Sequence, residues 1–318
     1  MSKITTPLKT VGVQRCHMPN PTPFTEIPAA QRQRLAYIEF RLWFYGEVSR
    51  KDVLDRFQIA TAAGTRDMIL YRDLAPLNLA YDRKVYRYRT SFQPLFFHPV
   101  DRVLASLTCG FGAGEPPNTG ALLAHAVPAR LNQPDLVTLS TVTRAIHRAT
   151  PLQLTYHSMK TGAVPRIIVP HALVDSGLRW HVRAFDRTRA EFRDLVLTRM
   201  EQVQPMEASF EGEHNVLAHE QLGADQQWNR AVALDLVPHP AHPYPLSIEK
   251  DFGMQAGRLS VTLRAATAGY VLRQWQVDCS PDARMRGPEF RLWLADGQQL
   301  DGVDNAVLAP GYWVAPAE

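Results

Sequence analysis

Apolar side chains in the first third of the chain recur at helical spacing and define three helices. The first helix is expected near residues 30–45. The second begins after Ser49, because Asp52 three residues later completes a capping-box-like start. Thr61 can cap the third helix, which Pro76 ends. The apolar positions that this spacing turns inwards are Leu35, Ile38, Leu42, Trp43, Val53, Leu54, Phe57, Met68, Ile69 and Leu74.

Two short strands follow the third helix. Residues 77–81 and 85–88 flank a polar turn at 82–84, and this spacing predicts a β-hairpin. Three helices followed by a hairpin are typical of a winged helix-turn-helix, which we place at residues 29–92. Residues 1–28 are rich in Pro and Thr and lack periodicity, so we expect a flexible tail there.

The rest of the chain divides into three further parts. Residues 93–142 have the pattern of a helical linker with a Gly- and Pro-rich break at 109–120. Five short strands predict a small Sm- or SH3-like β-barrel at 143–209, and the pattern at 210–318 predicts a small α+β domain. The fold class is therefore multidomain α+β. The strands and helix expected in the last domain are Val232–Leu236, Leu259–Leu263, Thr267–Trp275 and Phe290–Leu294.

Composition narrows the class of protein. Apolar residues make up 45% of the 318 residues and charged residues 21%, which is enough for packed cores. No run approaches the roughly 18 apolar residues of a membrane span, and the N-terminal segment does not have the apolar stretch of a signal peptide. Cys16, Cys109 and Cys279 match no metal or redox spacing. We expect a cytoplasmic protein with no membrane partner.

Charge is distributed unevenly along the chain. The first 100 residues hold 15 Lys and Arg against 8 Asp and Glu, a surplus of +7, and the remainder holds 20 against 23. Such a bias indicates a polyanion partner for the N-terminal part, although a solvated basic surface would have the same composition.

The third helix and the hairpin together predict a DNA interface. A supported helix of this kind can enter a major groove, where small residues near its start allow close approach, and a basic hairpin can contact phosphates. The alternative is a three-helix module that binds protein or nothing. The candidate DNA-binding residues are Thr61, Ala62, Thr65, Arg66 and Arg72 on the helix, and Arg83, Lys84 and Arg87 on the hairpin, where Tyr86 or Tyr88 could lean on the sugar-phosphate wall.

One strand of the barrel carries polar groups at alternate positions. In residues 179–186, alternation puts Trp180 on a core face and His181, Arg183 and Phe185 on the other face. Guanidinium groups beside a hydroxyl and an aromatic ring suit a phosphate-bearing ligand, although the arginines could instead form a surface ion-pair network. The candidate ligand-binding residues are Tyr156, Ser158, His181, Arg183, Arg193 and Arg199.

Motifs for catalysis, metal binding and cofactors are missing from the sequence. His157, His171 and His181 have no helical ligand spacing and no cysteine partner, so a metal enzyme is the weakest interpretation. No G-x-S-x-G elbow, Walker A motif or dinucleotide fingerprint is present. We therefore expect no catalytic residues, no metal and no cofactor.

Three segments resemble a known family. RWHVRAFD and EFRDLVLTRM, at residues 179–186 and 191–200, resemble the signature of WYL domains, with Trp180 kept and His181 and Val182 in place of Tyr and Leu. TRDMILYRDLAP resembles the recognition helix of the winged helix that many WYL regulators carry. IEKDFGMQAGRLSVTLRAATAGYVLRQW resembles the WYL C-terminal extension. The similarity is greatest to dimeric repressors of phage-defence islands, beside BREX and CBASS systems.

The resemblance implies a function for each part. It implies a homodimeric repressor, associated with the nucleoid, that binds an inverted-repeat operator in double-stranded DNA. A nucleotide or oligonucleotide effector on the WYL domain would relieve repression, and we expect the linker helices to carry dimerisation. The alternative is a WYL module that binds single-stranded nucleic acid or regulates a partner without operator specificity.

Overall fold

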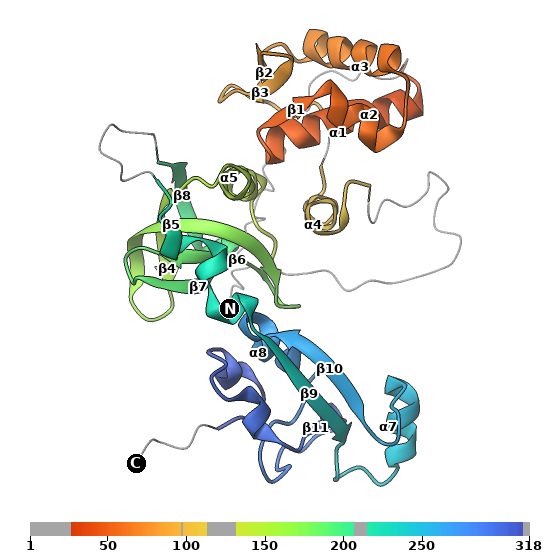
Figure 1. Ribbon diagram of the computed structural model, residues 1–318, viewed down its shortest axis with the longest axis vertical. Coiled ribbons are helices and arrows are strands. Elements are labelled where there is room, and N and C mark those ends of the chain that lie inside the picture. The colour runs from red at the N-terminus through yellow and green to blue at the C-terminus, as the bar shows by residue number, and fades with distance from the viewer. Residues whose placement is uncertain (1–26, 97, 113–131, 207–214, 314–318) are drawn as a thin grey trace, which may run out of the picture. The chain divides into compact units, whose positions relative to one another are not determined.

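The computed structural model describes residues 27–96, 98–112, 132–206 and 215–313 (Figure 1). The chain forms two compact units, residues 1–97 and 98–318. The tail expected at 1–28, with Cys16, lies almost entirely outside the described residues, as does most of the break expected at 109–120. Among the described residues, no helix combines the length and apolarity needed to cross a membrane.

The first unit has the predicted winged helix-turn-helix architecture. Its sheet has the antiparallel order β1-β3-β2, in which β1 is a strand that the hydrophobic pattern did not reveal. The elements are α1 (Ala29–Phe44), β1 (Glu47–Ser49), α2 (Arg50–Phe57), α3 (Thr61–Leu74), β2 (Leu79–Asp82) and β3 (Val85–Tyr88).

Local chemistry explains where α2 and the hairpin turn form. The capping box is confirmed, because Ser49 Oγ accepts from the Asp52 backbone N–H at 3.3 Å and Asp52 Oδ2 accepts from the Ser49 N–H at 2.7 Å. At the hairpin tip, Arg83 and Lys84 have φ values of 45° and 74°. Two adjacent residues with positive φ form the turn that matches strand twist, and both residues are exposed.

The register of α3 differs in part from the prediction. Its N-cap is Ala60 rather than Thr61, and no side chain caps it. Met68 faces inwards as expected, but Ile69 is 41% exposed, whereas Tyr71 is fully buried. The inward positions are those that follow Gly64 at helical spacing, and Gly64 itself packs so closely on Leu54 that a Cβ there would lie 2.7 Å from Leu54 Cδ2.

The second unit contains the five predicted WYL strands. They form one curved antiparallel sheet in the order β7-β6-β5-β4-β8 (Figure 1). The second of these strands is longer than the short strands expected: it begins at Gly162 and runs for 14 residues with a bulge between Pro170 and Ala172, so it pairs with β4 and then with β6. The elements are β4 (Leu152–Ser158), β5 (Gly162–Asp175), β6 (Trp180–Asp186), β7 (Glu191–Val196), η1 (Leu197–Arg199) and β8 (Met200–Pro205).

Two helices precede this sheet, α4 (Val100–Cys109) and α5 (Leu136–Arg148). Asp135 caps α5 by accepting from the Thr138 N–H at 2.9 Å. Helix α5 packs on β5 and β8 and continues without a break through residue 142. The linker–WYL boundary that we expected at that residue therefore falls inside a continuous helix.

The C-terminal domain has the predicted α+β composition. Its sheet has the order β10-β9-β11, and alternate residues of β9 form the core with one face of α8. Helix α7, which begins at Pro245 and spans only eight residues, was not predicted. The main elements are β9 (Ala231–Pro238), α7 (Pro245–Phe252), β10 (Leu259–Arg264), α8 (Ala265–Gln274) and β11 (Leu292–Leu294). The short elements are η2 (Ala218–Glu220), η3 (Leu222–Ala224), α6 (Gln226–Asn229), η4 (Gly297–Leu300) and η5 (Ala306–Leu308).

Candidate DNA-binding surface and ligand pocket

The outward face of α3 presents a stripe of small, polar and basic residues. Thr61, Ala62 and Arg66 are exposed and Thr65 is half-buried. Ile69, the exposed apolar residue one turn further on, lies on the same stripe. Arg72 is also exposed, with its guanidinium 2.9 Å from the Asp73 carboxylate.

A basic residue of α2 joins this stripe. Arg50 Nη1 donates to Thr65 Oγ1 at 3.1 Å, and the Thr65 hydroxyl donates to the Thr61 carbonyl at 2.9 Å. Arg50 was not predicted as a DNA-binding residue, although its place directly after the N-cap Ser49 puts it in the first turn of α2, where helix-turn-helix proteins approach the DNA backbone.

The basic residues of the wing differ in whether their charges are paired with carboxylates. Arg83 and Lys84 are exposed at the tip, whereas Arg87 bonds Glu47 at 2.9 Å and Asp82 at 3.0 Å. Tyr86, which we expected to lean on the sugar-phosphate wall, is 4% exposed and donates its hydroxyl hydrogen to the Met68 carbonyl. Tyr86 is a core residue because its strand position faces α3.

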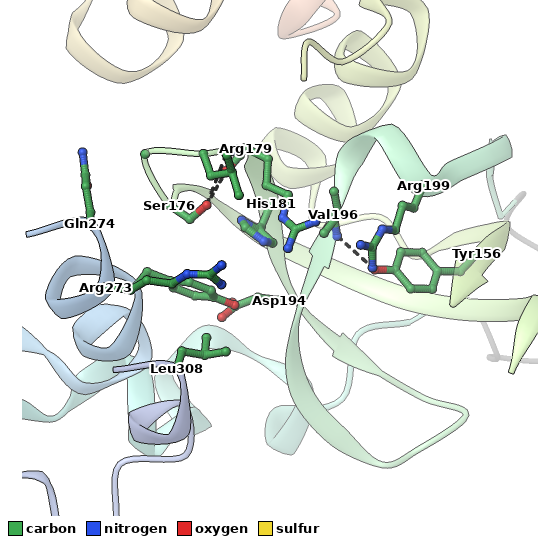
Figure 2. A pocket seen from close by; sticks show the side chains of 13 residues that line it. Tyr156, Ser176, Arg179, His181, Asp194, Val196, Arg199, Arg273, Gln274 and Leu308 are labelled. Atoms are coloured by element: carbon green, nitrogen blue, oxygen red, sulfur yellow. Dashed lines mark hydrogen bonds between the residues drawn. The ribbon is translucent and has the colours of Figure 1, made fainter. Parts of the chain in front are cut away.

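Three of the six predicted ligand residues meet in one pocket. Tyr156, His181 and Arg199 line a pocket of about 480 Å³ between the WYL sheet and α8 (Figure 2). Further residues of this pocket, from the turn before β6, from β7 and from α8, were not predicted. They include Ser176, Arg179, Asp194, Tyr270, Arg273 and Gln274.

The other three predicted ligand residues lie elsewhere. Ser158 Oγ accepts from the Lys160 and Thr161 backbone N–H groups in the β4–β5 turn. Arg193 pairs in register with Ala184, so it lies on the opposite face of the sheet from Arg183 and bonds the exposed Glu191. Side-chain alternation within one strand does not determine how the neighbouring strand pairs with it, so the face of Arg193 could not be predicted.

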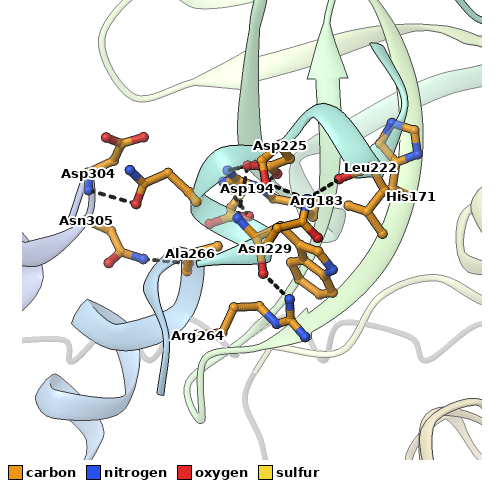
Figure 3. Close-up of polar contacts among 12 residues, drawn as sticks. His171, Arg183, Asp194, Leu222, Asp225, Asn229, Arg264, Ala266, Asp304 and Asn305 are labelled. Carbon is orange, nitrogen blue, oxygen red and sulfur yellow. Dashed lines mark hydrogen bonds and ion pairs between the residues drawn. The ribbon is translucent and has the colours of Figure 1, made fainter. Parts of the chain in front are cut away.

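Arg183 is buried in an ion-pair network. Its Nε and Nη2 donate to the Asp225 carboxylate at 2.7 and 3.0 Å, and its Nη1 lies 3.3 Å from Asp194 (Figure 3). All seven residues of β6 are buried, because the segment that contains Asp225 covers the face we expected to be open at Arg183, and α8 covers it at His181. Arg183 therefore fixes the Asp194 side chain of the neighbouring strand and holds the segment that contains Asp225 against the sheet.

The electrostatics of the pocket centre on His181. Burial, with the nearby charges of Arg179 and Arg199, lowers the pKa of His181 to about 4. Its Nδ1 has no hydrogen-bond partner among the described residues, and its ring lies 5.0 Å from the Tyr270 ring at an angle of 31°. Burial raises the pKa of Tyr270, and the neighbouring Asp194 charge raises it further.

The pocket is also rich in uncompensated positive charge. Within the described part of the chain, the guanidinium groups of Arg179, Arg199 and Arg273 make no hydrogen bond or ion pair. The lining carboxylate, Asp194, is engaged by Arg183 and by the Tyr270 hydroxyl. Such a pocket can receive an anion with an aromatic group.

His157 and His171 of the WYL domain have separate partners, and neither contacts His181. His157 lies 3.0 Å from Glu201, and His171 Nε2 lies 2.6 Å from the Glu220 carbonyl. No group of three or more His, Cys, Asp or Glu side chains among the described residues is arranged to hold a metal ion.

Comparison with known proteins covers all three folded parts. Residues 30–108 match the BrxR transcriptional regulator winged helix-turn-helix domain, residues 137–205 match the WYL domain, and residues 231–300 match the BrxR transcriptional regulator C-terminal dimerization domain.

Three relatives match most of the chain. The chain is 33% identical to the DNA-binding transcriptional repressor CapW of Pseudomonas aeruginosa, over 81% of this chain and 86% of the relative. It is 31% identical to CapW of Escherichia coli (strain KTE188), over 77% and 82%, and 28% identical to CapW of Stenotrophomonas maltophilia, over 78% and 84%. The chain belongs to the BrxR/CapW family of WYL-domain transcriptional repressors.

BrxR/CapW membership confirms the resemblance found in the sequence. The family is one of DNA-binding repressors rather than enzymes, as predicted. Residues 231–300 match a dimerization domain, so homodimerisation involves the C-terminal domain, a role that we did not predict for it. The dimerisation role that we expected for the linker helices at 93–142 stays a prediction.

Proposed function

We propose that the chain is a homodimeric repressor that binds an inverted-repeat operator of a phage-defence locus, and that an effector in the WYL pocket relieves repression. The observation that carries the first half is the exposed stripe of α3 beside a wing tip with unengaged charges. The second half is supported by the cationic pocket around His181.

In the proposed DNA complex, helix α3 and the wing make different contacts. The Thr61, Ala62, Thr65 and Arg66 stripe enters the major groove, where small residues allow close approach and Arg66 reaches a base edge or a phosphate. Arg83 and Lys84 contact phosphates. Arg72 and Arg87 contribute less, because each is already paired with a carboxylate. Two protomers then hold half-sites about one helical turn or a multiple apart.

The proposed effector site is the pocket around His181, which contains three of the six residues predicted from the sequence. Tyr156, His181 and Arg199 contact the effector, a nucleotide or nucleic-acid fragment whose phosphate meets the guanidinium groups. Arg183 supports the pocket indirectly by holding Asp194. The effector can weaken operator binding only by its differential affinity for the two states of the dimer.

Gel shifts over a salt series test the DNA half. Arg66→Ala should weaken binding to the operator, and the double change Arg83→Ala with Lys84→Ala should also reduce the slope of log affinity against log salt by about 2. Arg284→Ala removes an exposed arginine of the C-terminal domain and serves as the control. Unchanged duplex affinity in both test variants, or a preference for single strands without sequence discrimination, would contradict the proposal.

A further inference from the structure

Helix α8 belongs to two structures at once. Ala265, Ala268 and Leu272 are fully buried in the core of the C-terminal dimerisation domain. On the other side of the same helix, Tyr270 and Arg273 line the WYL pocket. Figure 2 shows Arg273 reaching from α8 towards the side of the pocket that carries Arg179 and His181. One wall of the pocket is therefore part of the dimerisation domain.

This wall is fixed firmly to its own domain. The Gly269 N–H donates to Asn305 Oδ1 at 2.9 Å. Asn305 Nδ2 donates to the Ala266 carbonyl at 2.6 Å (Figure 3). A Cβ at Gly269 would lie 1.9 Å from the Asn305 carbonyl oxygen, so α8 and the adjoining η5 turn are in direct backbone contact. Leu308 of that turn also lines the pocket. A displacement of Arg273 therefore moves the dimerisation domain together with α8.

The opposite wall belongs to the WYL domain. It consists of His181 on β6, Arg199 at the end of η1, and the 176–179 turn. The two walls touch through the Tyr270 and His181 rings and at Gly177, where an added Cβ would lie 2.5 Å from the Gln274 side chain. Gly177 has a φ of 76°, a conformation that favours glycine and lets the turn approach α8 closely.

Both walls of the pocket carry positive charge. Arg179 and Arg199 belong to the WYL wall and Arg273 to the dimerisation wall, and none has an anionic partner among the described residues. Like charges in a partly enclosed space repel, and a bound anion converts that repulsion into attraction. His181 Nδ1, buried and without a partner in the described chain, offers a further polar contact to the same ligand.

We propose that the pocket is a two-domain anion clamp, in which a phosphate-bearing ligand joins Arg179 and Arg199 of the WYL domain to Arg273 of the dimerisation domain. This inference rests on the proposed function in taking the pocket as the effector site. Closing the clamp changes the angle between the two domains in each protomer. Because the dimerisation domains pair the protomers and each winged helix precedes its WYL domain in the chain, the change alters the spacing of the two reading helices.

Binding of thymidine monophosphate to the full-length protein tests the clamp, with thymidine as the ligand without phosphate. Calorimetry should detect thymidine monophosphate, and both Arg273→Gln and Arg199→Gln should weaken it at least about tenfold, since each removes a charge-assisted contact. Arg193→Gln, a change to an exposed arginine of the same domain, should leave it unchanged. Equal affinity in wild type and Arg273→Gln, or no detectable binding to wild type, would overturn the clamp.

Operator affinity with and without thymidine monophosphate separates binding from coupling. Saturating ligand should lower the operator affinity of wild type, and Asn305→Ala, which loosens α8 from its domain but keeps Arg273, should retain ligand binding and lose most of that effect. A full effect in Asn305→Ala would overturn the coupling through α8. Operator binding without ligand tests the proposed function alone, so failure of one account is distinguishable from failure of the other.

A variant that supplies the negative charge itself needs no ligand. Arg273→Glu places a carboxylate opposite Arg179 and Arg199, so it should weaken operator binding without any added ligand. Arg273→Gln should have a smaller effect in the same direction. Wild-type operator affinity in Arg273→Glu, in a protein with unchanged thermal stability, would count against the clamp.

Discussion

His181 shows how one residue can be identified from sequence while its environment is not. Strand alternation correctly separated it from Trp180, but the expected open face is covered, and His181 is 3% exposed. The cover comes from α8, nearly ninety residues later in the chain, through the Tyr270 ring. No local pattern contains that information. For the same reason Asp225, 42 residues from Arg183, was not predicted as its partner.

Burial of His181 predicts a pH dependence of stability. Its pKa is lowered to about 4, first by burial and then by Arg179 and Arg199, so the unfolded chain binds the proton more readily between about pH 6.5 and 4. Stability is fully present above pH 6.5 and falls by about 3 kcal/mol as pH approaches 4. In urea unfolding at a series of pH values, His181→Tyr should lose this part of the dependence. His157→Tyr, at an exposed histidine, should keep it, and parallel curves for wild type and His181→Tyr would refute the assignment.

The exposure of Ile69 predicts a base contact. Ile69 lies on the outward stripe of α3 that we propose enters the major groove, and an apolar side chain there suits the methyl group of thymine. Replacing thymines of the operator one at a time by uracil should weaken wild-type binding about fourfold at one position of each half-site, the effect of about 0.8 kcal/mol for one buried methyl. Ile69→Ala should be insensitive to that replacement, whereas Leu77→Ala, at an exposed apolar residue outside α3, should remain sensitive. Equal sensitivity in Ile69→Ala would exclude the contact.

Among the elements, the winged helix was the easiest to predict, because its signals are local. The capping box at Ser49 and the polar turn at 82–84 each act within a few residues. The extent of β5 was not predicted, since its first half pairs with β4 and its second half with β6. Pairing with two neighbours is a tertiary property that apolar alternation does not encode.

A buried carboxylate connects three segments of the winged helix. Glu39 of α1 is fully buried and accepts from the Leu95 and Phe96 backbone N–H groups, each at 2.9 Å, and from the Tyr71 hydroxyl of α3 at 3.1 Å. Asn78 donates to the Tyr71 hydroxyl and to the Gln93 carbonyl. The recognition helix is thereby tied to the segment that leaves the domain.

Removing this carboxylate should destabilise the winged helix strongly. Glu39→Ala leaves two half-buried N–H groups and the buried Tyr71 hydroxyl without their acceptor, so we expect a loss of about 3–5 kcal/mol in urea unfolding. Glu47→Ala, which breaks the exposed pair with Arg87, should cost at most about 1 kcal/mol. A loss in Glu39→Ala no larger than in Glu47→Ala would show that the network is not a stabilising connection.

At the scale of the whole molecule, the order of the three folded parts was predicted, whereas the dimerisation role of the C-terminal domain was not. Sequence motifs predicted the winged helix, the WYL domain and its C-terminal extension, and family membership confirms these three parts. Only half of the lining of the candidate ligand pocket was predicted, because its second wall comes from the C-terminal domain. The pattern of one strand does not show that a distant domain completes the pocket.

Footprinting of the purified full-length dimer on the DNA upstream of its own gene tests the central claim most directly. We predict two protected half-sites related by a dyad, with centres one helical turn or a multiple apart, that Arg66→Ala no longer protects. Uniform protection without an inverted repeat, or no protection at all, would contradict the account.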